Sequence, residues 1–222
     1  MSGTTSTTQE KTDKNEKLKS LKIMLIGEAA VGKSSIMYRY TMNSFKLNML
    51  GTAGIDFKKK EIVVNNEPIK IVLYDTAGHE RFRKIIKNHC KGANGIVLVY
   101  DIGEEKSIER LSTWMTDIEE NSDKGVEIIL IGNKSDIEPR KITEEQGKEL
   151  SLKYNVPIIE TSAKTGHNID LLFDMLINNI LSKERKVESS NKQEIDIKKN
   201  EIVNINQTKK KPESVGCQCL IF

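Results

Sequence analysis

The chain of 222 residues has few cysteines, few aromatic residues and no long apolar run. Its longest apolar stretches, such as Ile128–Ile131, are far shorter than the roughly 18 residues of a membrane-spanning helix, so we expect no such helix. The first twenty residues lack the apolar core of a signal peptide, which predicts a cytosolic protein. Cys90, Cys217 and Cys219 are too few for a disulfide framework, and thiols stay reduced in the cytosol.

The charges of the chain are nearly balanced, with 35 Lys and Arg against 32 Asp and Glu. The basic excess lies mainly in residues 182–222, which hold nine basic and six acidic side chains. A nucleic-acid-binding domain would instead carry a strongly basic face, so we expect no nucleic-acid partner. The anionic surface of a membrane fits the basic tail better.

Composition divides the chain into three segments. Residues 1–20 and 182–222 are polar and almost free of aromatic side chains, which predicts a disordered N-terminal extension and a flexible C-terminal tail. Several isoleucines within the tail leave open a weak helix or a docking contact there. Residues 21–181 hold the periodic apolar segments and should form one folded domain.

Short apolar runs alternate with amphipathic segments in this domain. The runs predict strands at Leu21–Ile26, Ile55–Val64, Ile69–Tyr74, Gly95–Asp101, Val126–Gly132 and Pro157–Glu160. Helices are expected at Ser35–Asn43, Glu105–Glu120, Glu144–Lys153 and Ile169–Ile180. Thr143 and Gln146 predict a capping box, and Asn65 and Asn66 predict a hairpin turn. The alternation indicates an α/β fold with helices on both faces of a six-stranded, mostly parallel sheet that has one antiparallel edge strand.

The strongest motif is the run from Gly27 to Ser34, G-E-A-A-V-G-K-S, which fits the pattern G-x-x-x-x-G-K-[ST]. It stands between the first expected strand and the first expected helix, where backbone N–H groups can surround a phosphate. In such a loop the side chain of Lys33 reaches the β- and γ-phosphates, and the Ser34 hydroxyl ligates Mg²⁺. The other expected nucleotide contacts of this loop are Gly27, Ala30, Val31, Gly32 and Ser35.

Three later motifs each follow an expected strand. In D-T-A-G, Asp75 would hold the metal through water and the Gly78 N–H would face the γ-phosphate. In N-K-S-D, the Asp136 carboxylate can accept from N1–H and the N2 amine of guanine, a pattern that adenine lacks. Asn133 and Lys134 belong to the same motif, and Lys134 can lie along the base. A backbone N–H of Ser162-Ala163-Lys164 would bind guanine O6, so the motifs together predict GTP or GDP with Mg²⁺.

This set of motifs resembles the Ras superfamily of small GTPases, and Gly54–Phe57, Asp75–Phe82 and Gly95–Ile102 resemble its Rab branch. The resemblance implies a P-loop NTPase G domain that acts as a monomer and hydrolyses GTP to GDP and phosphate. It also implies that Thr52 ligates Mg²⁺ only when GTP is bound, and that Phe45 covers the guanine.

The same resemblance implies a switch that recruits effectors to membranes in vesicle traffic. An exchange factor, an activating protein, an escort protein or dissociation inhibitor, and effectors would bind through two switch segments, Met49–Phe57 and Thr76–Cys90. The expected location is the cytosol and the cytoplasmic face of an intracellular or plasma membrane.

The end of the chain, C-Q-C-L-I-F, fits a prenylation signal. Cys219 is the modified residue of a C-a-a-X pattern, and Phe222 favours a geranylgeranyl group. One lipid anchors a protein only marginally, but Lys209-Lys210-Lys211 would add attraction to an anionic membrane. Cys217 offers a second lipid position, so both one and two prenyl groups stay open.

Several positions depart from the Rab pattern. His79 stands where the family has the glutamine that orients the attacking water, which predicts slow intrinsic hydrolysis. Ala29 occupies a crowded loop position that is usually Gly or Ser, and Ala53 replaces the usual isoleucine. Tyr74 and His89 replace a tryptophan and a tyrosine, so we expect different effectors.

Two alternatives remain beside a cycling switch. His79 and Ala29 also fit a GTP-loaded membrane scaffold with negligible hydrolysis. A metabolic P-loop kinase is the other alternative, but Asn133–Asp136 and the prenylation signal argue against it. Competition of ATP for bound GDP would favour the kinase.

Overall fold

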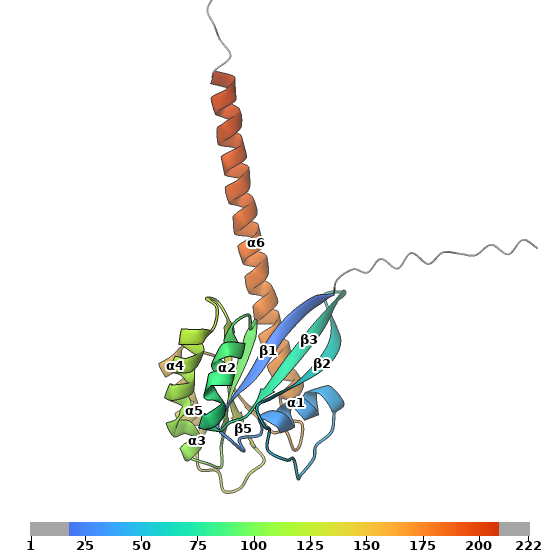
Figure 1. Cartoon of the computed structure of the whole chain (residues 1–222), viewed down its shortest axis with the longest axis vertical. Helices are drawn as coiled ribbons and strands as arrows, with labels where there is room; N and C mark the ends of the chain where they lie inside the picture. Colours follow the sequence, from blue (N-terminus) through green and yellow to red (C-terminus); the bar gives the residue numbers. More distant parts are fainter. Residues whose placement is uncertain (1–17, 209–222) are drawn as a thin grey trace, which may run out of the picture. The chain divides into compact units, whose positions relative to one another are not determined.

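The computed structural model describes residues 18–208, and for residues 188 and 190–208 it describes the backbone alone. The chain divides into two compact units, Met1–Leu176 and Ile177–Phe222, and each is described by itself. The first unit contains a sheet with helices on both of its faces (Figure 1). This arrangement confirms the predicted α/β fold.

The sheet has six strands in the order β2-β3-β1-β4-β5-β6. Their bounds are β1 (Lys19–Gly27), β2 (Ile55–Val64), β3 (Glu67–Thr76), β4 (Gly95–Asp101), β5 (Glu127–Asn133) and β6 (Ile158–Thr161). All neighbouring strands pair in parallel except β2 and β3, which are antiparallel. The predicted hairpin is confirmed, and Asn65 and Asn66 in its turn have φ of 52° and 65°. Positive φ at both central residues gives the twist that a two-residue hairpin turn needs.

The helices are α1 (Lys33–Met42), α2 (Arg83–Cys90), α3 (Lys106–Glu109), α4 (Leu111–Asn121), α5 (Glu144–Tyr154) and α6 (Ile169–Thr208), with a 3₁₀ helix η1 (Glu80–Phe82). Helices α2 and α4 cover one face of the sheet, where Trp114 and Ile86 pack against the buried side chains of β1 and β4. On α1, the ring of Tyr40 stacks on Phe173 of α6 at 3.8 Å. All seven residues of β4 are buried, as expected for a central parallel strand.

Three helical segments differ from the sequence-based expectation. The helix expected at 105–120 is interrupted at Arg110, whose ψ of 0° leaves the α region and separates α3 from α4. Helix α2 and η1 were not expected, because eight residues are too few to show a helical period. Helix α6 continues to Thr208, well into the expected tail. Residues 182–208 contain no Gly or Pro and many Lys and Glu, which favour helix.

The ends of the chain are only partly described. Strand β1 begins at Lys19, just inside the expected N-terminal extension. The basic run Lys209–Lys211 and the proposed lipidation sites Cys217 and Cys219 lie outside the described residues. Within residues 18–208, no helix combines the length and the apolar character that crossing a bilayer requires.

Helix α5 begins with the predicted capping box. The Gln146 N–H donates to Thr143 Oγ1 at 3.3 Å, and the Thr143 N–H donates to Gln146 Oε1 at 2.9 Å. We expect Thr143→Ala to lower the free energy of unfolding by about 1 kcal/mol, because a helix N–H loses its acceptor. Urea denaturation measures this loss, and Thr143→Ser should keep most of the stability. Equal stability of Thr143→Ala and the parent would contradict the prediction.

Candidate functional site

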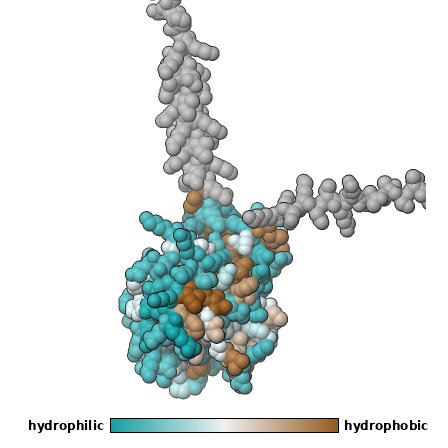
Figure 2. All heavy atoms as spheres, in the orientation of Figure 1, coloured by the Kyte–Doolittle hydropathy of each residue, from teal (hydrophilic) through white to brown (hydrophobic). Residues whose placement is uncertain are grey.

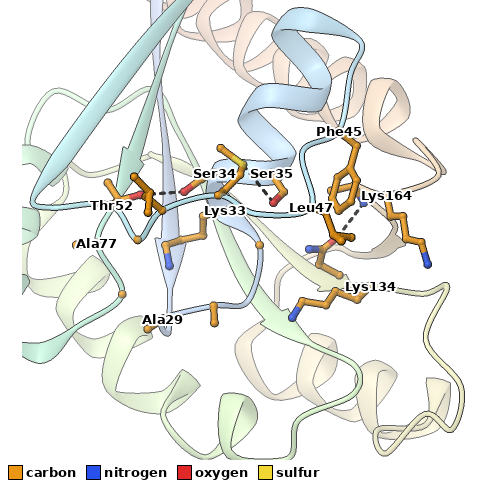
Figure 3. Close-up of a pocket in the computed structure, with 18 of the residues that line it drawn as sticks. Ala29, Lys33, Ser34, Ser35, Phe45, Leu47, Thr52, Ala77, Lys134 and Lys164 are labelled. Carbon is orange, nitrogen blue, oxygen red and sulfur yellow. Dashed lines mark hydrogen bonds between the residues drawn. The ribbon is translucent and has the colours of Figure 1, made fainter.

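A cavity of about 690 Å³ lies where the loops after β1, β3, β5 and β6 meet the segment between α1 and β2 (Figure 3). The carboxyl ends of parallel strands share one edge of a sheet, and such an edge is where ligands bind in α/β folds. The cavity is lined by Ala29, Ala30, Gly32, Lys33, Ser34, Ser35, Phe45, Leu47, Met49, Leu50, Gly51, Thr52, Thr76, Ala77, Gly78, His79, Asn133, Lys134, Asp136, Ile137, Ala163 and Lys164. Its volume suits a ligand as large as a nucleotide.

The structure brings the residues expected at the site together. Figure 3 shows Phe45, Lys134 and Lys164 at one end of the cavity and Lys33, Ser34 and Thr52 toward the other. Four expected residues do not line the cavity but support residues that do: Gly27, Val31, Asp75 and Ser162. The sequence therefore identified both ends of one cavity.

The loop after β1 turns sharply between the strand and α1. Gly27 has a φ of 144°, and a Cβ at this position would lie 2.2 Å from the carbonyl oxygen of Val99 on β4. Ala30 has a φ of 64° and Gly32 a φ of 101°, both in the left-handed region. Successive residues of this kind turn backbone N–H groups inward, which forms a concave site for an anion. The N-terminus of α1 adds partial positive charge to it.

The side chain of Lys33 lies beneath this loop and is only 5% exposed. Its Nζ donates to the carbonyl oxygens of Gly27 at 2.9 Å and Glu28 at 2.6 Å. Burial lowers the pKa of Lys33 to about 8, although the nearby charges of Asp75 and Glu28 act in the opposite direction. The loop thus holds a buried amine close to the carboxylate of Asp75.

Three oxygen-bearing side chains from separate segments meet beside Lys33. Ser34 Oγ and Thr52 Oγ1 donate to Asp75 Oδ2 at 2.5 and 2.7 Å, and the two hydroxyls are 2.9 Å apart. Asp75 Oδ1 is buried and has no hydrogen-bond partner among the described residues. Burial raises the pKa of Asp75, while hydrogen bonds from Ser34 and Thr52 act to lower it. Hydroxyl and carboxylate oxygens with one unsatisfied acceptor fit Mg²⁺, which prefers oxygen ligands.

Gly78 and His79 also line the cavity. A Cβ on Gly78 would lie 2.1 Å from the backbone nitrogen of Ala29, so Gly78 sits directly against the loop after β1. The His79 side chain is exposed at the cavity, and its carbonyl accepts from the Phe82 N–H at 3.0 Å to open η1. The residue that departs from the family pattern is therefore accessible from the cavity.

Asn133 is only 1% exposed and ties two loops together. Its Nδ2 donates to the carbonyl of Val31 at 2.8 Å, and its Oδ1 accepts from Thr161 Oγ1 at 3.2 Å and the Ala163 N–H at 3.3 Å. Asn133 therefore fixes the loop after β1 relative to the loop after β6.

The carboxylate of Asp136 is oriented from two sides. Ser162 Oγ donates to Asp136 Oδ1 at 2.5 Å, and Lys164 Nζ lies 3.3 Å from Asp136 Oδ2. Burial acts to raise the pKa of Asp136, but the contacts with Ser162 and Lys164 outweigh it and lower that pKa. The group is therefore a charged acceptor at neutral pH, as recognition of two donors on guanine requires.

Three residues at the site were missed by sequence reasoning. Asp101 pairs with Lys134, with 2.5 Å between Oδ2 and Nζ. Arg39 donates from Nε to the carbonyl of Ala163 at 2.8 Å. Glu28 Oε1 accepts from the indole N–H of Trp114 at 2.9 Å. Glu28 and Asp101 lie within segments that the sequence analysis identified, but the spacing of those segments does not indicate these contacts, since each residue acts on a partner distant in sequence.

Three aromatic side chains, those of Phe57, Tyr74 and His89, lie next to one another. The rings of Phe57 and Tyr74 are 6.0 Å apart, and those of Tyr74 and His89 are 6.4 Å apart. Phe57 is 53% and Ile85 42% exposed, and Figure 2 shows apolar side chains gathered on the otherwise largely hydrophilic face around α2. Tyr74 and His89, which stand where the Rab pattern has a tryptophan and a tyrosine, therefore form one surface with Phe57.

Comparison with known proteins gives a consistent result. The model of the Ras family matches residues 22–182. The Ras-related protein Rab-13 of Rattus norvegicus is 40% identical over 190 residues, 84% of this chain and 94% of that protein. Rab-8B of Homo sapiens is 40% identical over 172 residues, 77% of this chain and 83% of that protein. Rab-13 of Canis lupus familiaris is 44% identical over 163 residues, 73% of this chain and 80% of that protein. The residues that the family model matches include every residue that lines the cavity.

Proposed function

Because the chain belongs to the Ras family and is a small GTPase of the Rab type, we propose that its cavity binds GTP and GDP in a cycle that recruits effectors to membranes. Members of this family bind guanine nucleotides with Mg²⁺ and hydrolyse GTP to GDP and phosphate. The observation that supports the switch most directly is the meeting of Ser34, Thr52 and Asp75 from three separate segments.

The phosphates would occupy the concave loop between β1 and α1. Backbone N–H groups of Ala30 to Ser35 would surround them, and Lys33 would exchange its carbonyl partners for phosphate oxygens. Ser34 and Thr52 would hold the metal through their hydroxyls, and Asp75 through water. Bound Mg²⁺ would neutralise negative charge on the phosphates.

The base would occupy the other end of the cavity. Asp136, already oriented by Ser162, would accept from N1–H and the N2 amine of guanine. Phe45 and Lys134 would flank the base, and a backbone N–H of the loop 162–164 would face O6. Asn133 would connect this end, through Val31, to the loop between β1 and α1 (residues 27–34), which we call the phosphate loop.

The switch would work through Thr52 and Gly78. Thr52 touches the metal site, and Gly78 lies against the phosphate loop. With GTP bound, the metal and the γ-phosphate would hold both segments in place, and hydrolysis would release them. The surface of Phe57, Tyr74 and His89 borders these segments, so an effector bound there would sense the nucleotide. The exchange factor, the activating protein and the escort protein or dissociation inhibitor would bind the same segments.

Attachment to the membrane completes the proposed cycle. Geranylgeranylation of Cys219, with Cys217 as a second position, and the basic run 209–211 would anchor the chain to the cytoplasmic face of a membrane. The dissociation inhibitor would keep the lipidated protein in the cytosol between cycles.

His79 decides between a cycling switch and a GTP-loaded scaffold. The histidine side chain is more rigid than that of glutamine, and its ring cannot offer an acceptor and a donor at the positions of the carboxamide, so it should orient the attacking water poorly. We expect slow hydrolysis, which would give a long-lived GTP state. The exposure of His79 at the cavity supports its assignment as the residue that slows hydrolysis. Ala29, which lies beside Gly78, also favours the GTP-loaded scaffold.

Single-turnover hydrolysis of GTP tests this assignment. We expect His79→Gln to hydrolyse GTP about 10²-fold faster than the parent, at the low end of the 10²- to 10⁴-fold that a positioned group contributes in general acid–base catalysis. His167→Gln makes the same exchange at another exposed histidine and should leave the rate unchanged. Equal rates for the parent and His79→Gln would show that His79 is not limiting. Negligible rates for both proteins would favour the GTP-loaded scaffold, with Ala29 as the residue that limits hydrolysis.

A further inference from the structure

Arg39 lies on α1, away from the four sequence motifs, yet it contacts the loop expected to read the base. Its Nε donates to the carbonyl of Ala163 at 2.8 Å, and its Nη2 donates to the carbonyl of Lys164 at 2.5 Å. Nη1 donates to the carbonyl of Asn43, which follows the last residue of α1, at 3.3 Å. The planar guanidinium thus spans two consecutive carbonyls, a geometry that a lysine cannot reproduce.

These two bonds orient the peptide groups of the loop. In a trans peptide the C=O and the next N–H point in opposite directions. Holding the carbonyl of Lys164 toward Arg39 therefore directs the Thr165 N–H away from it. That N–H donates to Ser162 Oγ at 3.1 Å, and Ser162 Oγ donates to Asp136 Oδ1 at 2.5 Å. A continuous path of bonds thus runs from Arg39 to the carboxylate.

Helix α1 connects this path to the phosphate end of the site. The same helix begins with Lys33 and Ser34 and carries Arg39 near its last turn. Six residues of α-helix rise about 9 Å. The single helix α1 therefore sets the separation between the phosphate loop and the loop 162–164. Tyr40, next to Arg39, is 5% exposed and stacks on Phe173, which keeps this end of α1 in place.

We propose that Arg39 is a positioning residue for guanine recognition, which acts through Ser162 on the orientation of Asp136. The inference rests on the proposed guanine site and adds a residue that determines its specificity. Arg39 touches the backbone of the loop and not the base. Its loss should therefore weaken the reading of the guanine N2 amine by Asp136 more than it weakens the binding of phosphates.

Comparison of GDP with IDP, which lacks the N2 amine, tests this role. Each diphosphate displaces a fluorescent GDP analogue from the full chain with Mg²⁺. We expect Arg39→Ala to lower the affinity for GDP about tenfold and the affinity for IDP much less, because one charged hydrogen bond to the base is misaligned. The preference for GDP over IDP should shrink accordingly. Arg39→Lys should retain part of the preference for GDP over IDP. If Arg39→Ala does not fold, the reduced preference of Arg39→Lys tests the same role.

Two further variants make the test specific. Arg140 donates from Nε to the carbonyl of Ile142 at 2.9 Å and pairs with Glu160 at 2.5 Å, so Arg140→Ala removes similar bonds elsewhere. It should keep the parental preference for GDP. In the double variant of Arg39→Ala with Ser162→Ala, the loss of preference should not exceed that of Ser162→Ala alone, because both act on one path.

An unchanged GDP preference in Arg39→Ala would overturn the inference, even if both affinities fell together. An equal loss of preference in Arg140→Ala would overturn it too, since the effect would then be general. A parent chain that does not prefer GDP over IDP would overturn the proposed guanine site and this inference together. A parent with that preference, unaffected by either Arg39 variant, would overturn the inference alone.

Discussion

Replacement of Lys33 by alanine is expected to lower the affinity for GDP by about 10²- to 10⁴-fold. The side chain is buried beneath the phosphate loop and already bonds two of its carbonyls, at Gly27 and Glu28. In the complex it would form two hydrogen bonds with phosphate, each contributing about 1.5–3 kcal/mol because both partners are charged. Isothermal titration calorimetry with GDP and Mg²⁺ measures the loss. A dissociation constant within fivefold of the parent value would contradict the proposed role.

The stability of the nucleotide-free protein distinguishes a role of Lys33 in phosphate binding from a role in folding. Burial lowers the pKa of Lys33 to about 8 in the folded chain, below its value in the unfolded chain. A lysine with a lowered pKa opposes folding while it is charged, at pH below about 8, and this opposition fades as the pH rises toward the unfolded pKa. Removal of this charge should offset the loss of the two hydrogen bonds, so at neutral pH the nucleotide-free Lys33→Ala variant should unfold at a urea concentration no lower than that of the parent. Lys84→Ala, at an exposed position of α2, is the control for GDP binding.

Gly78→Ala is expected to reduce GTP hydrolysis by about 10²-fold or more, the order seen when one group that stabilises the transition state is removed. The added Cβ would lie 2.1 Å from the Ala29 nitrogen and 2.2 Å from the Glu28 carbonyl carbon. Both are backbone atoms of the phosphate loop, so the segment around Gly78 must move away. Its N–H could then no longer face the γ-phosphate. Single-turnover hydrolysis with excess enzyme measures the effect.

Binding of GDP should be almost unchanged in Gly78→Ala, because GDP has no γ-phosphate for this segment to contact. Gly92→Ala is the matched control. Its φ of 73° makes alanine strained there, but the added Cβ meets nothing within 4 Å. That variant should lose some stability and keep its hydrolysis rate. Parental hydrolysis in Gly78→Ala, or an equal loss in Gly92→Ala, would rule out the expected clash.

Prediction of the fold succeeded where the sequence pattern was long or chemically distinctive. The bounds of β2 and β4 match the expected strands, and the capping box at Thr143 and the hairpin turn at Asn65-Asn66 are confirmed. Prediction failed for short or interrupted helices, namely α2 and the break at Arg110. A helix of two turns shows too little periodicity, and tertiary contacts decide whether it forms.

The sequence by itself determined which local motifs meet at the cavity. The phosphate loop, Asp75, the N-K-S-D motif and Ser162–Lys164 are local patterns, and each follows a strand whose parallel direction could be inferred. Parallel strands end at one edge of a sheet, so the sequence also implied that these motifs meet. The Ras-family relationship, including the Rab resemblance, followed from the same residues and agrees with the comparisons.

Only the tertiary structure decided how the motif residues are supported. Arg39 bonds Ala163, which is 124 positions away, and Asn133 bonds Val31, 102 positions away. Asp101 pairs with Lys134 across two neighbouring strand ends. A local motif encodes the residues that touch a ligand, because their spacing must match it. Supporting contacts depend on where the packed helices and strands place distant side chains, and no spacing within the sequence records that.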